Sequence, residues 1–105
     1  MTMPHENIPF DTMPWQDKAP GLRVKSVLRG TMRIRLVEFG LDFVEPGWCD
    51  TGHVGYVVSG RFQVAFEDGI RTFKAGDGLH IAPDTPHRHH ATDAVATVFL
   101  VESFG

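Results

Sequence analysis

Apolar and polar residues alternate with a period of two along most of the chain from residue 22 onward. Successive side chains of a β-strand point to opposite faces of a sheet, so this pattern indicates strands with one buried face. We expect strands at 24–28, 32–38, 41–44, 54–59, 61–66, 70–74, 79–81, 87–90 and 94–102. We find no convincing helical pattern and no internal repeat.

Turn residues separate these segments at short intervals. Asp68-Gly69 is a strong signal for a two-residue hairpin, because both positions of such a turn need a positive φ. A glycine-rich turn at 75–78 and a proline-rich corner at 83–86 separate later strands. Many short strands joined by frequent turns predict an all-β chain, folded as an antiparallel sandwich or barrel.

Residues 1–20 differ from the rest of the chain, since four prolines lie among mostly polar residues. Proline has no backbone donor and fixes φ, so this density argues against a helix and predicts an extended N-terminal arm. Phe10 and Trp15 are large aromatic residues within this arm. We expect them to pack either on the chain's own barrel or on a partner subunit.

The bulk composition excludes several classes of protein. The length of 105 residues suits one domain, and the formal charge of −3 predicts no nucleic-acid partner. Arg33 and Arg35, the densest basic pair, have the spacing of the polar face of a strand. No apolar run is long enough for a membrane span. The single cysteine, Cys49, excludes an internal disulfide and predicts a reducing, cytoplasmic location.

Two stretches combine the strand pattern with histidine and with glycine or proline. They read PGWCDTGHVGYVVSG at 46–60 and AGDGLHIAPDTPHRHH at 75–90. Together they resemble the two sequence motifs of the cupin superfamily. The resemblance implies a double-stranded β-helix, which is a jelly-roll barrel, for the domain at 21–105.

The first cupin motif contains two histidines followed by a glutamate and a glycine. When the motif is aligned on Gly60, His53 occupies the position of the glutamate. The two histidine positions fall on Gly47 and Cys49, or on Pro46 and Trp48 if the motif is one residue longer. Both family histidines are therefore absent from this chain.

The second motif fits the chain more closely. Gly76 opens it, and His87 falls on the metal-binding histidine of the family. Ala82 replaces a proline, Asp84 replaces an inner glycine, and Ala91 stands where an asparagine is often found. His87 is the site position that the resemblance fixes best.

Cupins typically bind a divalent metal with three histidines and a carboxylate that face into the barrel. The resemblance therefore implies a metal site in which Cys49 or His89 joins His53 and His87. Imidazole and thiolate ligands favour zinc or iron, with nickel as a further candidate. In the alternative interpretation, the two histidines are hydrogen-bonded pocket residues of a metal-free barrel, and Cys49 is a small buried side chain.

Three further residues are candidates for the lining of a small-molecule pocket. Trp48 and Tyr56 could contact a ligand, although both could equally belong to the core or to an interface. Asp50, which we expect near the barrel mouth, could bind a ligand or cap a loop.

The resemblance supports two classes of function. One is a divalent-metal-dependent enzyme of the isomerase, decarboxylase or oxygenase class that acts on a small molecule. The other is a metal-free, non-catalytic module that binds a small metabolite in the same barrel. Either protein is expected to be a homodimer, because the aromatic arm offers apolar surface that a short barrel does not fully cover.

Overall fold

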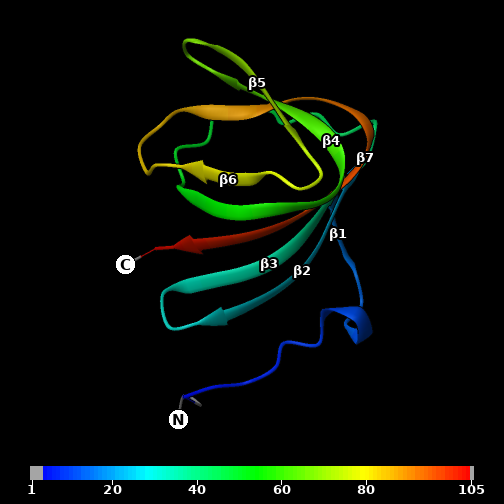
Figure 1. Cartoon of the computed structure of the whole chain (residues 1–105), viewed down its shortest axis with the longest axis vertical. Coiled ribbons are helices and arrows are strands. Elements are labelled where there is room, and N and C mark those ends of the chain that lie inside the picture. Colours follow the sequence, from blue (N-terminus) through cyan, green and yellow to red (C-terminus); the bar gives the residue numbers. More distant parts are fainter. Residues whose placement is uncertain (1–3, 105) are drawn as a thin grey trace.

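The computed structural model describes residues 4–104, and it shows an antiparallel β-barrel (Figure 1). The elements are η1 (Phe10–Thr12), β1 (Gln16–Ala19), β2 (Leu22–Arg29), β3 (Met32–Phe39), β4 (His53–Phe66), β5 (Gly69–Lys74), β6 (Gly78–Ile81) and β7 (His87–Ser103). The strands follow the order β1-β2-β3-β7-β4-β5, and β6 pairs with β4. This arrangement confirms the predicted all-β, jelly-roll fold.

Strands β4 and β7 are the long central pair of the barrel, with 14 and 17 residues. They pair along most of their length, and Figure 1 shows both curving through the barrel. The alternation predicted two shorter strands in place of each, at 54–59 and 61–66 and at 87–90 and 94–102, and that division is wrong. The register shifts near Ser59 and Arg61 instead, so the strand bends without ending. Gly60, with φ of 80°, lies at this bend.

The expected strand at 41–44 is not formed. Residues 41–52 instead form a loop between β3 and β4, in which only Cys49 makes an isolated β-bridge. Leu41 and Val44 are exposed. Their alternation with polar residues therefore does not reflect a buried sheet face. The loop brings Cys49 against the first residue of β7, His87.

The described part of the N-terminal arm folds onto its own barrel. Strand β1 pairs with β2, and the Phe10 ring packs edge-on against Phe99 at 6.2 Å between centroids. Lys25 is buried under the arm, where its Nζ donates a hydrogen bond to the Phe10 carbonyl and lies over the Trp15 ring. The arm contains one 3-10 turn of three residues at Phe10–Thr12. Among the elements at 4–104, no helix is long and apolar enough to cross a membrane.

The core fills the inside of the barrel with inward-facing residues of six strands. Its buried hydrophobic members are Val24, Val37, Val57, Phe62, Val64, Phe73, Leu79, Ile81, Ala96, Val98 and Leu100. His87, His89 and Glu102 on β7 are also buried. Burial of polar side chains costs free energy unless they are hydrogen-bonded, so these three residues mark a part of the interior with a specific role.

Candidate metal and ligand site

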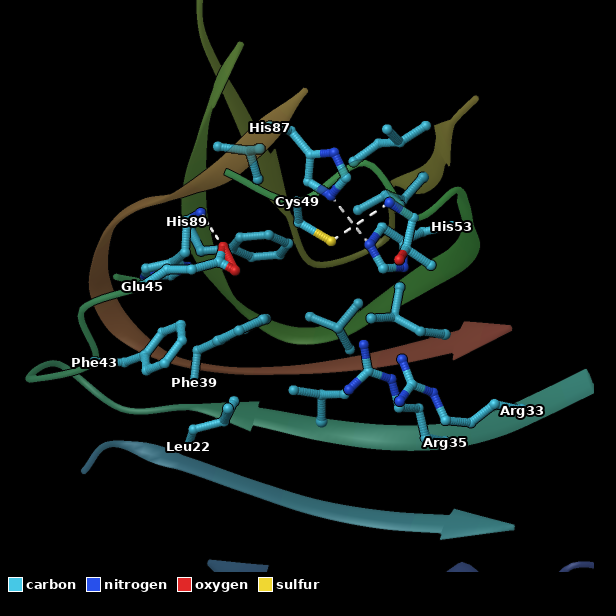
Figure 2. A pocket seen from close by; sticks show the side chains of 18 residues that line it. Leu22, Arg33, Arg35, Phe39, Phe43, Glu45, Cys49, His53, His87 and His89 are labelled. Carbon is cyan, nitrogen blue, oxygen red and sulfur yellow. Dashed lines mark hydrogen bonds between the residues drawn. The ribbon is translucent and has the colours of Figure 1, made fainter. Parts of the chain in front are cut away.

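A cavity of ≈ 160 Å³ lies inside the barrel. Apolar core residues form most of its wall, and Figure 2 shows the polar side chains that point into it. These polar lining residues are Arg33, Arg35, Glu45, Cys49, Thr51, His53, His87 and His89. The cavity is therefore an apolar space with a few convergent polar groups, which is the usual character of a small-molecule site.

Cys49, His53 and His87 form one cluster in this cavity, with ligand atoms that all lie within 4.8 Å of one another. They come from the β3–β4 loop, the start of β4 and the start of β7. Two backbone hydrogen bonds fix the loop to β7, from Cys49 N to His87 O at 2.7 Å and from His87 N to Cys49 O at 2.9 Å. Main-chain pairing therefore places the thiol beside the imidazole.

The hydrogen-bond partners of the two rings determine which nitrogens carry protons. Nδ1 of His87 lies 2.8 Å from the carbonyl oxygen of Thr85, which can only accept. Nδ1 of His53 lies 2.7 Å from Oε2 of Glu102. Both Nδ1 atoms therefore carry a proton, and the two Nε2 atoms are the ring nitrogens left to interact with one another.

These two Nε2 atoms face one another across 3.1 Å (Figure 2). Two lone pairs at that separation repel, unless a cation or a proton lies between them. A hydrogen-bonded Nδ1 is also the usual arrangement of a metal-ligating histidine, since it fixes the tautomer and the ring orientation. The residues present therefore fit a divalent metal.

Glu102 is the buried carboxylate that supports His53. It is 1% exposed, and it accepts hydrogen bonds from Arg33 Nε at 2.7 Å and from Arg35 Nη2 at 2.7 Å as well as from His53. Burial alone would raise the pKa of Glu102, but the hydrogen bonds from His53, Arg35 and Arg33 lower it to about 2. The carboxylate is therefore ionised and acts as an acceptor.

Sequence reasoning missed this network. The alternation predicts Arg33 and Arg35 on the polar face of a strand, but both line the interior, and the alternate residues Ile34 and Leu36 lie on the outer face. The available signal was Glu102, which follows Val98 and Leu100 at a spacing of two on the buried face of β7. An acid at such a position needs a basic partner inside the barrel.

His89 lies in the same cavity but apart from the cluster. Its ring stacks on Phe39 at 4.8 Å and also contacts Phe43 and Phe62. Nε2 lies 2.8 Å from Thr92 Oγ1, whereas Nδ1 is buried without a partner. Burial first, and the nearby His90 second, lower the pKa of His89 to about 4. The structure therefore places His89 in an aromatic wall, as a neutral ring.

The three predicted pocket residues do not line this cavity. Tyr56 is 51% exposed, because it alternates with the inward-facing Val57 and lies on the outer face of β4. Trp48 is also half exposed, with the guanidinium of Arg88 over its ring. Asp50 is exposed, and its carbonyl accepts a hydrogen bond from the Asp84 backbone at 2.9 Å.

Comparison with known proteins agrees with the barrel fold described above. A family model described as a cupin domain matches residues 49–102, which is just over half of the 105 residues. That range includes every member of the Cys49, His53 and His87 cluster as well as Glu102. A search of curated proteins found no match.

Several solved structures resemble this chain. KdgF from Halomonas sp. is 25% identical with a TM-score of 0.71, and the alignment covers 90% of each chain. A Ralstonia eutropha protein, provisionally named a mannose-6-phosphate isomerase, is 24% identical with a TM-score of 0.72, over 97% of this chain and 100% of that one. An RmlC-like cupin from Shewanella frigidimarina is 19% identical with a TM-score of 0.69, over 89% and 85%. The last two likenesses concern the fold alone.

Proposed function

The chain belongs to the cupin family, and we propose that its barrel binds one divalent metal ion through Cys49, His53 and His87, beside a cavity that takes a small molecule. The observation that carries this proposal is the pair of Nε2 atoms 3.1 Å apart, with a thiol sulfur within 4.8 Å of them. A cation between these atoms would remove their repulsion. The acceptors of the two Nδ1–H groups, the Glu102 carboxylate for His53 and the Thr85 carbonyl for His87, support the same proposal.

One thiolate and two imidazoles suit zinc, iron or nickel. Three protein ligands leave a coordination position open toward the cavity, as catalytic metal sites do. A metal held there would supply a Lewis acid that polarises an oxygen of the bound molecule. We propose an isomerase, decarboxylase or oxygenase reaction for this site, which is the range that the cupin resemblance implies.

The chain's own residues supply position and environment. Glu102 and the Thr85 carbonyl orient the two rings, and the bridge between Cys49 and His87 holds the thiol beside them. Core residues of the wall, such as Val98 and Leu100, keep the interior mostly apolar. Such surroundings strengthen electrostatic contacts with a bound ligand, because little water competes for them.

A second candidate function also has an observation in its favour. A single proton between the two Nε2 atoms would satisfy the same 3.1 Å geometry without a metal. The barrel would then be a metal-free, non-catalytic module that binds a small metabolite. The cytoplasmic location and the homodimer stay predictions for either candidate.

Elemental analysis of protein purified without a histidine tag separates the two candidates. We expect about one equivalent of metal after exposure to Zn²⁺, Fe²⁺ or Ni²⁺ and removal of excess ion. Co²⁺ as a spectroscopic probe should give thiolate-to-metal charge-transfer absorption that Cys49→Ser lacks. His80→Ala is the matched control, since His80 is an exposed histidine on β6. Uptake below about a tenth of an equivalent for every metal would reject the metal site.

A further inference from the structure

The interior charges of the barrel do not balance at the end of the cavity near Glu102. Two guanidinium groups, Arg33 and Arg35, share this one buried carboxylate. His53 is the third group on Glu102, to which it donates its Nδ1 proton. Glu45, the one acid among the lining residues of the cavity, lies on its aromatic side, where it accepts a hydrogen bond from the His89 backbone (Figure 2). One positive charge is therefore in excess beside Glu102.

The two arginines also have N–H groups that do not donate to Glu102. Arg33 gives Nε to Glu102, and Arg35 gives Nε and Nη2. Within residues 4–104, both Nη groups of Arg33 and Nη1 of Arg35 have no hydrogen-bond acceptor, and none of them is a fully buried unpaired atom. They are therefore at least partly accessible to solvent, and the Arg33 guanidinium also lies over the Phe104 ring, 5.0 Å from its centroid. Planar guanidinium donors of this kind match the two oxygens of a carboxylate.

The position of the pair suits a group that binds an incoming ligand. Arg33 and Arg35 line the cavity and also a groove along β1, β2 and β3. The lining of this groove is Gln16, Lys18, Leu22, Val24, Ser26, Leu28, Arg33 and Arg35. It includes three basic residues and no acid, so its potential attracts an anion toward the cavity.

We propose that Arg33 and Arg35 form the anion-binding end of the ligand site, and that the ligand is a small carboxylic acid. The inference rests on the proposed function only in taking the cavity as the ligand site. The cavity of ≈ 160 Å³ is close in volume to cavities that take a benzene-sized molecule, so the acid is short. Arg33, Arg35 and His53 lie close together, because all three donate hydrogen bonds to Glu102. A carboxylate held by the two guanidiniums therefore lies near the His53 ring.

Two probes that differ in charge but hardly in shape test this assignment. Pyruvate carries the carboxylate, and pyruvamide replaces it with a neutral amide. We expect pyruvate to bind at least about tenfold more tightly than pyruvamide, because a charged acceptor strengthens the contact with a guanidinium. Binding is followed by calorimetry and by the side-chain Nε–H signals of the arginines in nuclear magnetic resonance. Those of Arg33 and Arg35 should shift, whereas that of Arg61 should not.

Matched variants connect the selectivity to the pair. Arg33→Gln should lower pyruvate affinity about tenfold and remove the preference over pyruvamide. Arg61→Gln, which removes the same charge from an exposed ion pair with Asp93, should leave binding unchanged. Arg33→Lys keeps the charge but lacks the planar donors, so its affinity for pyruvate should lie between those of Arg33→Gln and Arg61→Gln. The wild-type comparison of the two probes stands even if a variant folds poorly.

Equal affinity for pyruvate and pyruvamide, or no binding of either at millimolar concentration, would overturn the inference. Tighter binding of inorganic phosphate than of pyruvate would overturn the carboxylate assignment. Metal content measured on the same samples keeps the two proposals separate. Protein that takes up metal without selecting pyruvate refutes only the anion site. Protein that selects pyruvate in the absence of metal uptake supports the anion site and refutes only the metal site.

Discussion

Oε2 of Glu102 lies 2.7 Å from Nδ1 of His53, so a residue near the C-terminal end of β7 orients the ring at the start of β4. The register explains how they meet, since Val54 pairs with Val101. Neighbouring residues on these paired strands therefore point into the barrel together. The same carboxylate joins β3 to the network through Arg33 and Arg35. Glu102 thereby links three strands around the candidate site.

We predict that Glu102→Gln lowers stability and metal affinity together. A neutral amide cannot satisfy His53 and both arginines, and the two guanidiniums lose their counter-charge. The free energy of unfolding should fall by about 3 kcal/mol, at the lower end of the range for a broken buried ion pair, because the side chains of Arg33 and Arg35 are 32% and 18% exposed and can be rehydrated. Metal affinity should fall about tenfold to a hundredfold. Chemical denaturation and metal titration measure the two effects.

Glu38→Gln is the matched control for this change. Glu38 forms an ion pair with Arg23 across β2 and β3, outside the cavity lining, and both side chains are partly exposed. Its loss should cost less than about 1 kcal/mol and leave metal affinity unchanged. If Glu102→Gln behaves like Glu38→Gln in both measurements, Glu102 does not position His53.

The alternation of residues 32–38 correctly predicted a strand but not which face lies inside. Ile34 and Leu36 seemed to be the core face, yet they lie outside, where Leu36 pairs with Phe99 beneath the arm. Arg33 and Arg35 point inward because Glu102 neutralises part of their charge. Local periodicity carries no information on Glu102, because Glu102 lies 69 residues from Arg33 and 67 residues from Arg35 along the chain.

The cupin resemblance indicated that Cys49, His53 and His87 lie close together, but not what surrounds them. Motif spacing placed these residues in one frame, and the structure brings their ligand atoms within 4.8 Å. Thr85 was missed because it acts through its backbone carbonyl, which any residue possesses. His89 was the alternative to Cys49 as a third ligand, because it shares a strand face with His87; in the structure its ring lies in the aromatic wall, stacked on Phe39.

We predict opposite outcomes for substitutions of His87 and His89. His87→Ala removes one of three candidate ligands and should abolish metal uptake. His89→Phe should keep metal uptake, because the new ring can pack on Phe39 and Phe62 as the imidazole does. Its stability should change by less than about 1 kcal/mol, since an unpaired buried nitrogen disappears with the hydrogen bond to Thr92. Metal analysis and thermal melting of both variants measure this. Loss of metal from His89→Phe alone would show that the ligand set is misassigned.

We predict that Gly60→Ala, within β4, destabilises the barrel more than Gly47→Ala in the β3–β4 loop. Gly60 has φ of 80°, and a Cβ there would meet the Val95 carbonyl and lie 2.6 Å from the Ala96 Cα. The bend of β4 against β7 therefore requires glycine, and we expect a loss of more than about 1 kcal/mol. Gly47→Ala is the control, because a Cβ at Gly47 meets nothing within 4 Å. Equal unfolding midpoints of the two variants would contradict this account of the bend.

The homodimer remains a prediction, and the structure suggests which face to test. Val54, Tyr56 and Val58 form a row on the outer face of β4, with exposures of 59%, 51% and 53%. The described part of the arm packs elsewhere, over Phe99 and Lys25, and leaves this row open. Exposed apolar rows of this kind often mark contacts between proteins, and a second copy of the same face would bury both rows around a two-fold axis.

We therefore expect light scattering above micromolar concentration to give the mass of a dimer for the wild-type chain and of a monomer for Tyr56→Asp. A charge at the centre of the row would be buried without a partner in the dimer, whereas in the monomer it stays hydrated. Ile70→Asp is the matched control, since Ile70 is similarly exposed but lies on β5, away from the row on β4. It should stay dimeric. A monomeric wild-type chain would refute the dimer, and a dimeric Tyr56→Asp would place the interface on another face.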